Sequence, residues 1–139
     1  QKSAKSPDTE ADMGEHFFTY ALLPHAGGLG EETFTQGILL NQPALCIAGA
    51  VKEQVGRFIK KNSDAVKIDA VKQAEDGDGF VVHMHEITGG RASVEITSDY
   101  PVRAYAACNL LEEYDGKTEG NTIHADFGPF EIKCFRIWM

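Results

Sequence analysis

The feature that most constrains this chain is a series of short strand-like runs that continues from residue 57 to the end. Turn residues separate these runs at intervals of roughly 8–12 residues, which is typical of a β-sandwich. In residues 65–74, for example, the apolar side chains of Val66, Ile68 and Ala70 alternate with charged ones. Because successive side chains of a strand point to opposite faces, such a run has one face for a core and one for solvent.

The chain as a whole therefore predicts an all-β fold, an antiparallel β-sandwich with one short helical excursion. The helix is expected over residues 31–40, where acidic residues precede an apolar run. The dipeptide Gly89-Gly90 predicts a two-residue hairpin, because such turns need positive φ angles. The expected strands are residues 16–23, 44–48, 58–62, 65–74, 80–88, 91–97, 104–112, 122–127 and 129–139.

The domain organisation is expected to be simple. Residues 1–13 are polar and contain one proline, so they predict an extended arm or linker from a preceding domain. Residues 14–139 are expected to form one sandwich domain, because their number suits a single hydrophobic core. The expected inward face of the last strand consists of Phe130, Ile132, Cys134 and Phe135.

The charge and the cysteines limit the class of protein. A net charge of −8 makes nucleic acid and anionic lipid surfaces poor partners. No stretch approaches the length of about 18 apolar residues that indicates a membrane-spanning helix. The cysteines Cys46, Cys108 and Cys134 lie far apart, each in an apolar run. They are expected to be buried free thiols in a reducing compartment, the cytoplasm.

Several residues have types that suit catalysis or metal binding. His83 and His85 point the same way on a strand and could chelate one ion, but no third ligand is evident. An outward polar face is the simpler interpretation. Glu86, Glu112 and Glu113 are candidate acid and base residues. Since adjacent strand residues point to opposite faces, Glu112 and Glu113 cannot serve one substrate, and we expect them to be solvated.

Two further groups of residues raise the question of a site. His25 follows a strand-like run and precedes glycines, but no phosphate-binding glycine motif or nucleophile elbow accompanies it. Its expected role is to anchor a turn. Trp138 is expected in the core or at an interface because it lies in the terminal strand. The aromatic residues that could form a sugar-binding platform are Tyr100, Tyr105, Tyr114 and Trp138.

Segments spread in order over residues 7–137 share motifs with a known family: PDTEADMGEHFFTYALLPHAGG, LNQPAL, FVVHMHEITGGRASVEI, ACNLLEE and FGPFEIKCFRI. Together they resemble the C-terminal region of glycoside hydrolase family 38 α-mannosidases, in the bacterial or cytosolic-type branch. The resemblance implies a sandwich of the galactose-mutarotase (supersandwich) type. It also implies mannose metabolism, with a retaining hydrolase that acts on terminal α-mannosides.

The resemblance implies that the chemistry lies outside this chain. The family holds its zinc ion and its aspartate nucleophile in an N-terminal catalytic domain, so this chain is expected to carry no catalytic or metal residue and to be inactive alone. Its expected partners are that catalytic domain, the mannoside bound by the full enzyme, and a second copy in a homo-oligomer. Asp12, Glu15 and His16 are candidates for the rim of the substrate cleft, because a polar loop that leads into a strand often makes edge contacts.

Other functions remain open at the level of the sequence. The chain could be an independent carbohydrate-binding β-sandwich module, a small metal-binding enzyme that uses His83 and His85, or a structural domain without a ligand. A domain that packs against a larger protein should expose an apolar patch of several hundred Å², more than a monomer usually shows.

Overall fold

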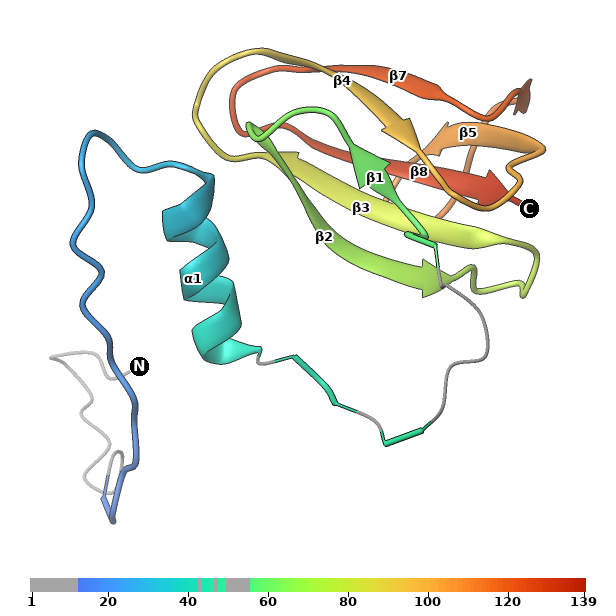
Figure 1. Ribbon diagram of the computed structural model, residues 1–139. Helices are drawn as coiled ribbons and strands as arrows, with labels where there is room; N and C mark the ends of the chain where they lie inside the picture. Colours follow the sequence, from blue (N-terminus) through green and yellow to red (C-terminus); the bar gives the residue numbers. More distant parts are fainter. Residues whose placement is uncertain (1–12, 43, 47, 50–55) are drawn as a thin grey trace, which may run out of the picture.

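The computed structural model describes residues 13–42, 44–46, 48–49 and 56–139 (Figure 1). It contains one helix and two β-sheets, so the predicted all-β sandwich with a single short helix is confirmed. No helix in the described part of the chain is long and apolar enough to cross a membrane. The elements are α1 (Glu31–Asn41), β1 (Lys60–Lys61), β2 (Val66–Gln73), β3 (Phe80–Glu86), β4 (Ala92–Thr97), β5 (Ala104–Cys108), β6 (Thr118–Glu119), β7 (Ile123–Phe127) and β8 (Ile132–Trp138).

The two sheets pack face to face, and all their strand pairs are antiparallel. The larger sheet has the strand order β2-β3-β8-β5-β6, and the smaller one has the order β1-β4-β7. Alternation along each strand directs every second side chain into the space between them. The resulting core consists of Val66, Val82, Met84, Phe135 and Ile137 from the larger sheet and Val94, Ile96, Ile123 and Phe127 from the smaller one.

The turn between β2 and β3 forms a hairpin. The backbone N–H of Asp78 donates to the Asp76 carboxylate at 2.9 Å, which closes the turn. Gly79 has a φ of 95°, and a Cβ at this position would lie 2.5 Å from the carbonyl oxygen of Ile137. Only glycine fits here, because both the backbone angle and the space exclude a side chain.

The predicted hairpin at Gly89-Gly90 is wrong. Strand β3 lies in the larger sheet and β4 in the smaller one, so this segment crosses between sheets. Gly89 does have a positive φ of 76°. Its backbone N–H donates to the carboxylate of Glu86 at 2.8 Å rather than to a partner strand. A glycine pair identifies a sharp turn, but the pairing of the flanking strands depends on where the second strand finds a partner.

The expected face of the last strand is also partly wrong. Phe130 and Ile132 are exposed, whereas Cys134 and Phe135 are buried. From Cys134 to Trp138 every side chain is buried. Strand β8 lies between β3 and β5, so one of its faces meets the core and the other is covered by turns of the same sheet. A central strand covered on both faces loses the alternation that marks an edge strand.

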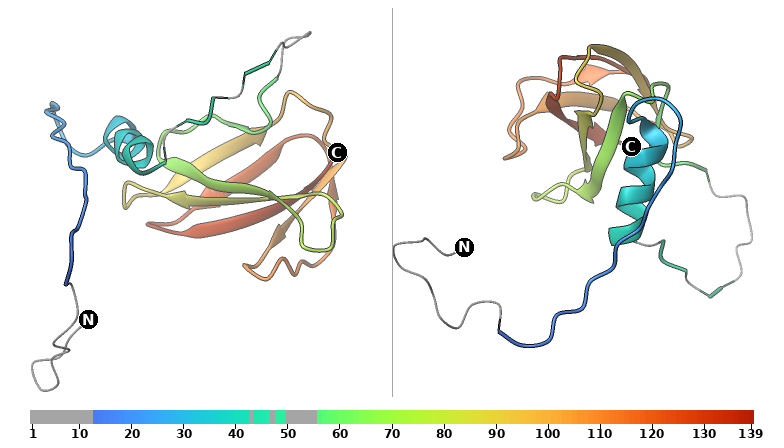
Figure 2. Two further views of the ribbon diagram at one scale, coloured as in Figure 1. Left: turned by 90° about the horizontal axis from the view of Figure 1, so that it is seen from below. Right: turned by 90° about the vertical axis from the view of Figure 1, so that its left-hand side faces the viewer.

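Two predicted strands are absent from the structure. Residues 16–23 form no strand, and all of them are exposed. Of residues 44–48, the four that are described form no strand, and residue 47 lies outside the described part. The predicted helix is confirmed, but α1 lies at one side of the sandwich (Figure 2). Strand-forming composition alone does not make a strand, because the backbone needs a partner.

Candidate functional site: an exposed apolar surface

Residues 13–30, which we call the apolar arm, form the most unusual surface of the described chain. The arm runs away from the sandwich as an extended segment (Figure 1, blue). Its aromatic side chains Phe17 and Phe18 are 93% and 82% exposed, and Leu22 is 89% exposed. Single exposed apolar residues are common, but several within one short segment are typical of an interaction surface.

Helix α1 extends this surface. No residue of α1 is buried, although its C-terminal half contains three consecutive aliphatic residues, Ile38, Leu39 and Leu40. A hollow of about 730 Å³ separates the helix from β2 and is lined in part by Phe34, Ile38 and Ile68. The helix therefore does not bury an apolar stripe against the sheet in the way that surface helices usually do.

Polar contacts join α1 to the sandwich. The Glu31 carboxylate lies 3.2 Å from the Nζ atoms of both Lys61 and Lys67. The Lys67 ammonium also donates to the hydroxyl of Thr35 at 2.5 Å. Lys67 itself is almost completely covered. These bonds orient the helix over β2, but they bury little apolar area and so stabilise the contact only modestly.

The predicted rim residues lie on or before the apolar arm. Glu15 and His16 are both exposed near its start, and Asp12 lies outside the described residues. His25, the other residue of interest in this region, is exposed where the arm turns toward α1. Glu15, His16 and His25 are therefore accessible from solvent.

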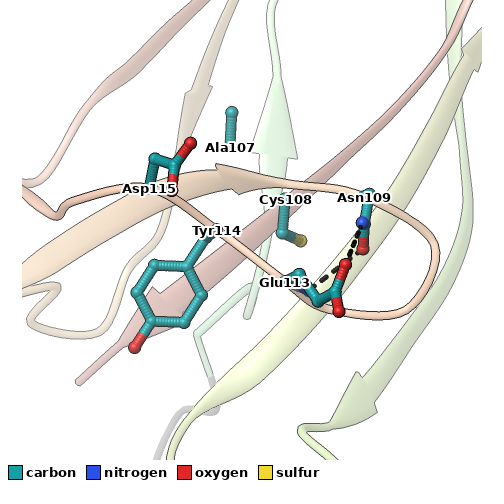
Figure 3. Close-up of a pocket in the computed structure, with 6 residues that line it drawn as sticks. All are labelled: Ala107, Cys108, Asn109, Glu113, Tyr114 and Asp115. Carbon is teal, nitrogen blue, oxygen red and sulfur yellow. Dashed lines mark hydrogen bonds between the residues drawn. The ribbon is translucent and has the colours of Figure 1, made fainter.

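A second hollow, of about 750 Å³, lies at the turn that follows β5 (Figure 3). Asn109 organises this turn: its side-chain oxygen accepts from the N–H groups of Leu111 and Glu113 at 2.9 and 3.0 Å. Its amide nitrogen donates to the Glu113 carboxylate at 2.8 Å, as the dashed lines in Figure 3 show. Glu113 is thus engaged in holding the turn.

Glu112 is buried, which corrects the expectation that it is solvated. Its carboxylate lies 2.8 Å from the Nζ of Lys72 and accepts from the backbone N–H of Glu75 at 2.8 Å. These partners lower the pKa of Glu112, and the carboxylates of Glu112 and Glu75 raise the pKa of Lys72 to about 12. Both groups of the pair stay charged near neutral pH, so Glu112 cannot donate a proton there.

Glu86 is completely buried and connects two crossovers between the sheets. Burial by itself would raise its pKa, but hydrogen bonds from Thr88, Phe130 and Gly89 lower it to about 2. The Thr88 hydroxyl donates to this carboxylate, and so do the N–H groups of Thr88, Gly89 and Phe130 at 2.7, 2.8 and 3.0 Å. Glu86 is therefore a structural carboxylate, not the candidate acid or base that its sequence context suggested.

The two candidate metal ligands of β3 have different partners. His85 Nδ1 lies 2.8 Å from the carboxylate of Asp69, whereas His83 Nδ1 lies 3.1 Å from the Sγ of Cys134. Among the described residues, no group of three or more His, Cys, Asp or Glu side chains is arranged to hold a metal ion. Both histidines lie on the outer face of the larger sheet, as in the simpler interpretation, but this face is not wholly polar, because Val81 and Cys134 are buried on it.

The aromatic residues do not line up as an exposed platform. Trp138 is buried, as expected for a core residue, and its ring lies 5.2 Å from that of Tyr114. Lys117 covers the Trp138 ring with its Nζ at 3.8 Å from the centroid. A sugar ring stacks on an accessible aromatic face, and that of Trp138 is already occupied.

The cysteines are all free thiols, but they are not all buried. Cys134 is buried and Cys108 is half-buried, whereas Cys46 is exposed. The expectation of buried thiols is therefore wrong for Cys46, which lies in the region between α1 and the sandwich.

The part of the chain that matches a known family lies within the sandwich and excludes the arm and α1. The family model described as the glycosyl hydrolases family 38 C-terminal beta sandwich domain matches residues 65–135. This range covers the strands from β2 to β7 and most of β8. No solved structure is significantly similar to the chain.

Longer relatives match almost the whole chain. Alpha-mannosidase G of Dictyostelium discoideum is 35% identical over 97% of this chain, and alpha-mannosidase 2C1 of Mus musculus is 30% identical over 95% of it. The alpha-mannosidase of Saccharomyces cerevisiae is 26% identical over 99%. The chain spans 13–15% of the length of these relatives.

Proposed function

This chain belongs to glycosyl hydrolase family 38, and from that premise we propose that it is a supporting part of an α-mannosidase. The sandwich, which is the C-terminal domain of the family, would pack against the catalytic domain of the same enzyme and support the wall of its cleft. The whole enzyme would hydrolyse terminal α-mannosides with retention of configuration.

The exposed apolar arm is the observation that carries this proposal. The arm exposes most of the apolar surface of Phe17, Phe18 and Leu22 to water. Covering this surface with a partner would contribute favourable free energy. The relatives are about seven times longer than this chain, so most of such an enzyme lies outside it. The simplest partner for the arm is therefore the remainder of the same enzyme.

We propose the finer features on the same basis. The zinc ion and the nucleophile would belong to the catalytic domain, and the enzyme would be of the bacterial or cytosolic type and work in the cytoplasm. Three free cysteines agree with a reducing compartment. Residues 1–13 would be a linker, and residues 14–139 the C-terminal domain.

Within that arrangement, Asp12, Glu15 and His16 would reach the rim of the substrate cleft. Glu15 and His16 precede the exposed aromatic residues of the arm, so docking of the arm would carry them to the catalytic domain. A homo-oligomer of the full enzyme stays a prediction, which sedimentation of the full-length protein tests.

The direct test uses the full-length enzyme with a charge introduced into the arm. Phe17→Asp should lower the activity of the purified enzyme on a chromogenic α-mannoside by about tenfold or more, because a buried unpaired carboxylate opposes docking. Asn121→Asp, at an exposed position on the sandwich, is the matched control and should leave activity unchanged. Unchanged activity in Phe17→Asp would show that the arm does not dock.

A second experiment separates this proposal from an independent carbohydrate-binding module. The isolated chain should show no turnover of the chromogenic mannoside, with or without added zinc. It should also show no heat of binding when titrated with mannose or mannobiose at millimolar concentration. Binding without turnover would favour the module, and turnover would contradict the supporting role.

A further inference from the structure

Three chemically reactive side chains form one row on the outer face of the larger sheet. In the antiparallel register, Cys134 of β8 lies directly opposite Cys108 of β5 on one side and His83 of β3 on the other. Residues directly opposite each other in a sheet present their side chains on the same face. The row is therefore Cys108, Cys134, His83, in that order across three neighbouring strands.

The register places the two thiols at a separation that suits a disulfide. Directly opposite residues of antiparallel strands have Cα atoms about 4.5–5.5 Å apart. Disulfides bridge Cα atoms that are about 4.4–6.8 Å apart. Cys108 also packs against the small buried cluster that contains Cys134. A bond between the two sulfur atoms thus needs no rearrangement of the strands.

A hollow gives a small molecule access to this pair. It has a volume of about 410 Å³, and its walls include Cys108 and Cys134 beside exposed Leu110, Leu111 and Ile132. Cys108 is the more accessible thiol, because it is half-buried whereas Cys134 is 3% exposed. An oxidant that enters the hollow meets Cys108 first.

We propose that Cys108 and Cys134 are a redox pair that a low-molecular-weight disulfide such as oxidised glutathione converts into a disulfide bond between β5 and β8. The Cys108 thiolate attacks one sulfur of oxidised glutathione, forms a mixed disulfide and releases one glutathione thiolate. The Cys134 thiolate then attacks the Sγ of Cys108 and releases the second glutathione. The protein loses two electrons and two protons, and the glutathione disulfide becomes two thiols.

His83 takes part in the second step. Its Nδ1 lies 3.1 Å from the Sγ of Cys134, within reach of the thiol proton. In the tautomer with an unprotonated Nδ1, the imidazole accepts this proton as Cys134 attacks. Because His83 lies beside the less accessible cysteine, Cys134 is the resolving thiol. Cys108 is then the thiol that reacts with the oxidant.

The surroundings of the pair make its oxidation slow at neutral pH. Burial, together with the nearby Cys134 and Glu112, raises the pKa of Cys108 to about 11. Burial also raises the pKa of Cys134. Only the thiolate attacks a disulfide. At pH values below that pKa, the rate of the first step should therefore rise about tenfold for each unit by which the pH is increased.

The test uses the chain with Cys46→Ser, which removes the exposed third thiol. After incubation with oxidised glutathione at about pH 8, the intact mass should fall by two hydrogen atoms. Trypsin should then release residues 104–117 joined to residues 134–136, and dithiothreitol should separate them. A protein that stays reduced, or that carries only a persistent mixed disulfide on Cys108, would overturn the proposal.

Matched variants test the order of the two steps. Cys134→Ser should accumulate the mixed disulfide on Cys108, and Cys108→Ser should react at least about tenfold more slowly with oxidised glutathione, because Cys134 is buried. His83→Asn should form the mixed disulfide at the normal rate and close it to the protein disulfide more slowly. Equal reactivity of Cys108→Ser and Cys134→Ser would contradict the assigned roles. If either serine variant fails to fold, the linked peptides of the Cys46→Ser protein still decide whether the pair forms.

Discussion

Two phenylalanines show how differently the two regions of this chain are built. Phe127 of β7 is 2% exposed and belongs to the core between the sheets, whereas Phe17 of the apolar arm is 93% exposed. Both lie in runs with the composition of a strand. Every strand of the sandwich is paired with a neighbouring strand, whereas residues 17–23 of the arm have a strand's composition but form no strand. The sandwich is stabilised by contacts within the chain, whereas the arm exposes apolar side chains that another part of an enzyme could cover.

The largest expected effect follows from truncating these two side chains. Phe127→Ala should lower the free energy of unfolding by about 4 kcal/mol, because it leaves a cavity in the core. Phe17→Ala should change it by less than about 0.5 kcal/mol, since the side chain contributes little to the isolated fold. Urea unfolding of both variants measures this, and similar losses in the two would remove the distinction between the regions.

The next effect concerns the buried carboxylate that joins the crossovers of the sandwich. Glu86→Gln should lower the thermal midpoint by roughly 10 °C. The glutamine amide cannot accept all four hydrogen bonds, because its NH₂ group would face N–H groups that now donate to a carboxylate oxygen. Glu15→Gln, on the arm, is the matched control and should leave the midpoint unchanged. Differential scanning calorimetry gives both values, and equal midpoints for the two variants would refute the role of Glu86.

Acid should act on the sandwich through the same group. The pKa of Glu86 is lowered from 4.5 to about 2 in the folded chain. Its contribution to stability is therefore complete above pH 4.5 and is lost as the pH falls toward 2. The thermal midpoint of the wild type should fall more steeply than that of Glu86→Gln over this range. Parallel pH profiles would show that Glu86 is not the group that titrates.

A smaller effect is expected where the two regions meet. Lys67→Met should loosen α1 on β2, because Thr35 loses its donor and Glu31 keeps only Lys61. Amide exchange in residues 31–41 should become several-fold faster, while the unfolding midpoint of the sandwich moves little. Lys60→Met is the control, since Lys60 pairs with Asp99 instead. Unaltered exchange in the helix would mean that these bonds do not hold it.

The sequence predicted the sandwich well where local pattern and tertiary pairing agree. The run at residues 91–97 became β4, because it alternates over the core. The run at residues 65–74 became β2, but a bulge between Ile68 and Ala70 shifts its register, so Ala70 is exposed instead of sharing the inward face of Val66 and Ile68. It failed where the outcome depends on distant partners. Residues 16–23 form no strand, and Gly89-Gly90 turns between sheets because β4 pairs with β1 and β7 rather than with β3. Neither fact is visible in a local pattern.

The sequence predicted that an exposed apolar surface exists, but it did not predict where that surface lies. An exposed apolar patch followed from the expected docking to a larger protein, but its location in a segment that looked like a core strand did not. Burial of Glu112 was missed, because its partner Lys72 lies far away in the sequence. The cysteine pair was missed for the same reason, since only the register of β5 against β8 brings Cys108 and Cys134 together.

Amide hydrogen exchange on the intact chain distinguishes the arm from the sandwich, because it measures both regions in one sample. The amides of residues 17–23 should exchange at nearly the rate of an unfolded peptide. The amides of β3, which is paired on both sides, should exchange only through global unfolding. Protection of the arm equal to that of β3 would show that the arm is part of the folded sandwich, and would contradict its role as a docking surface.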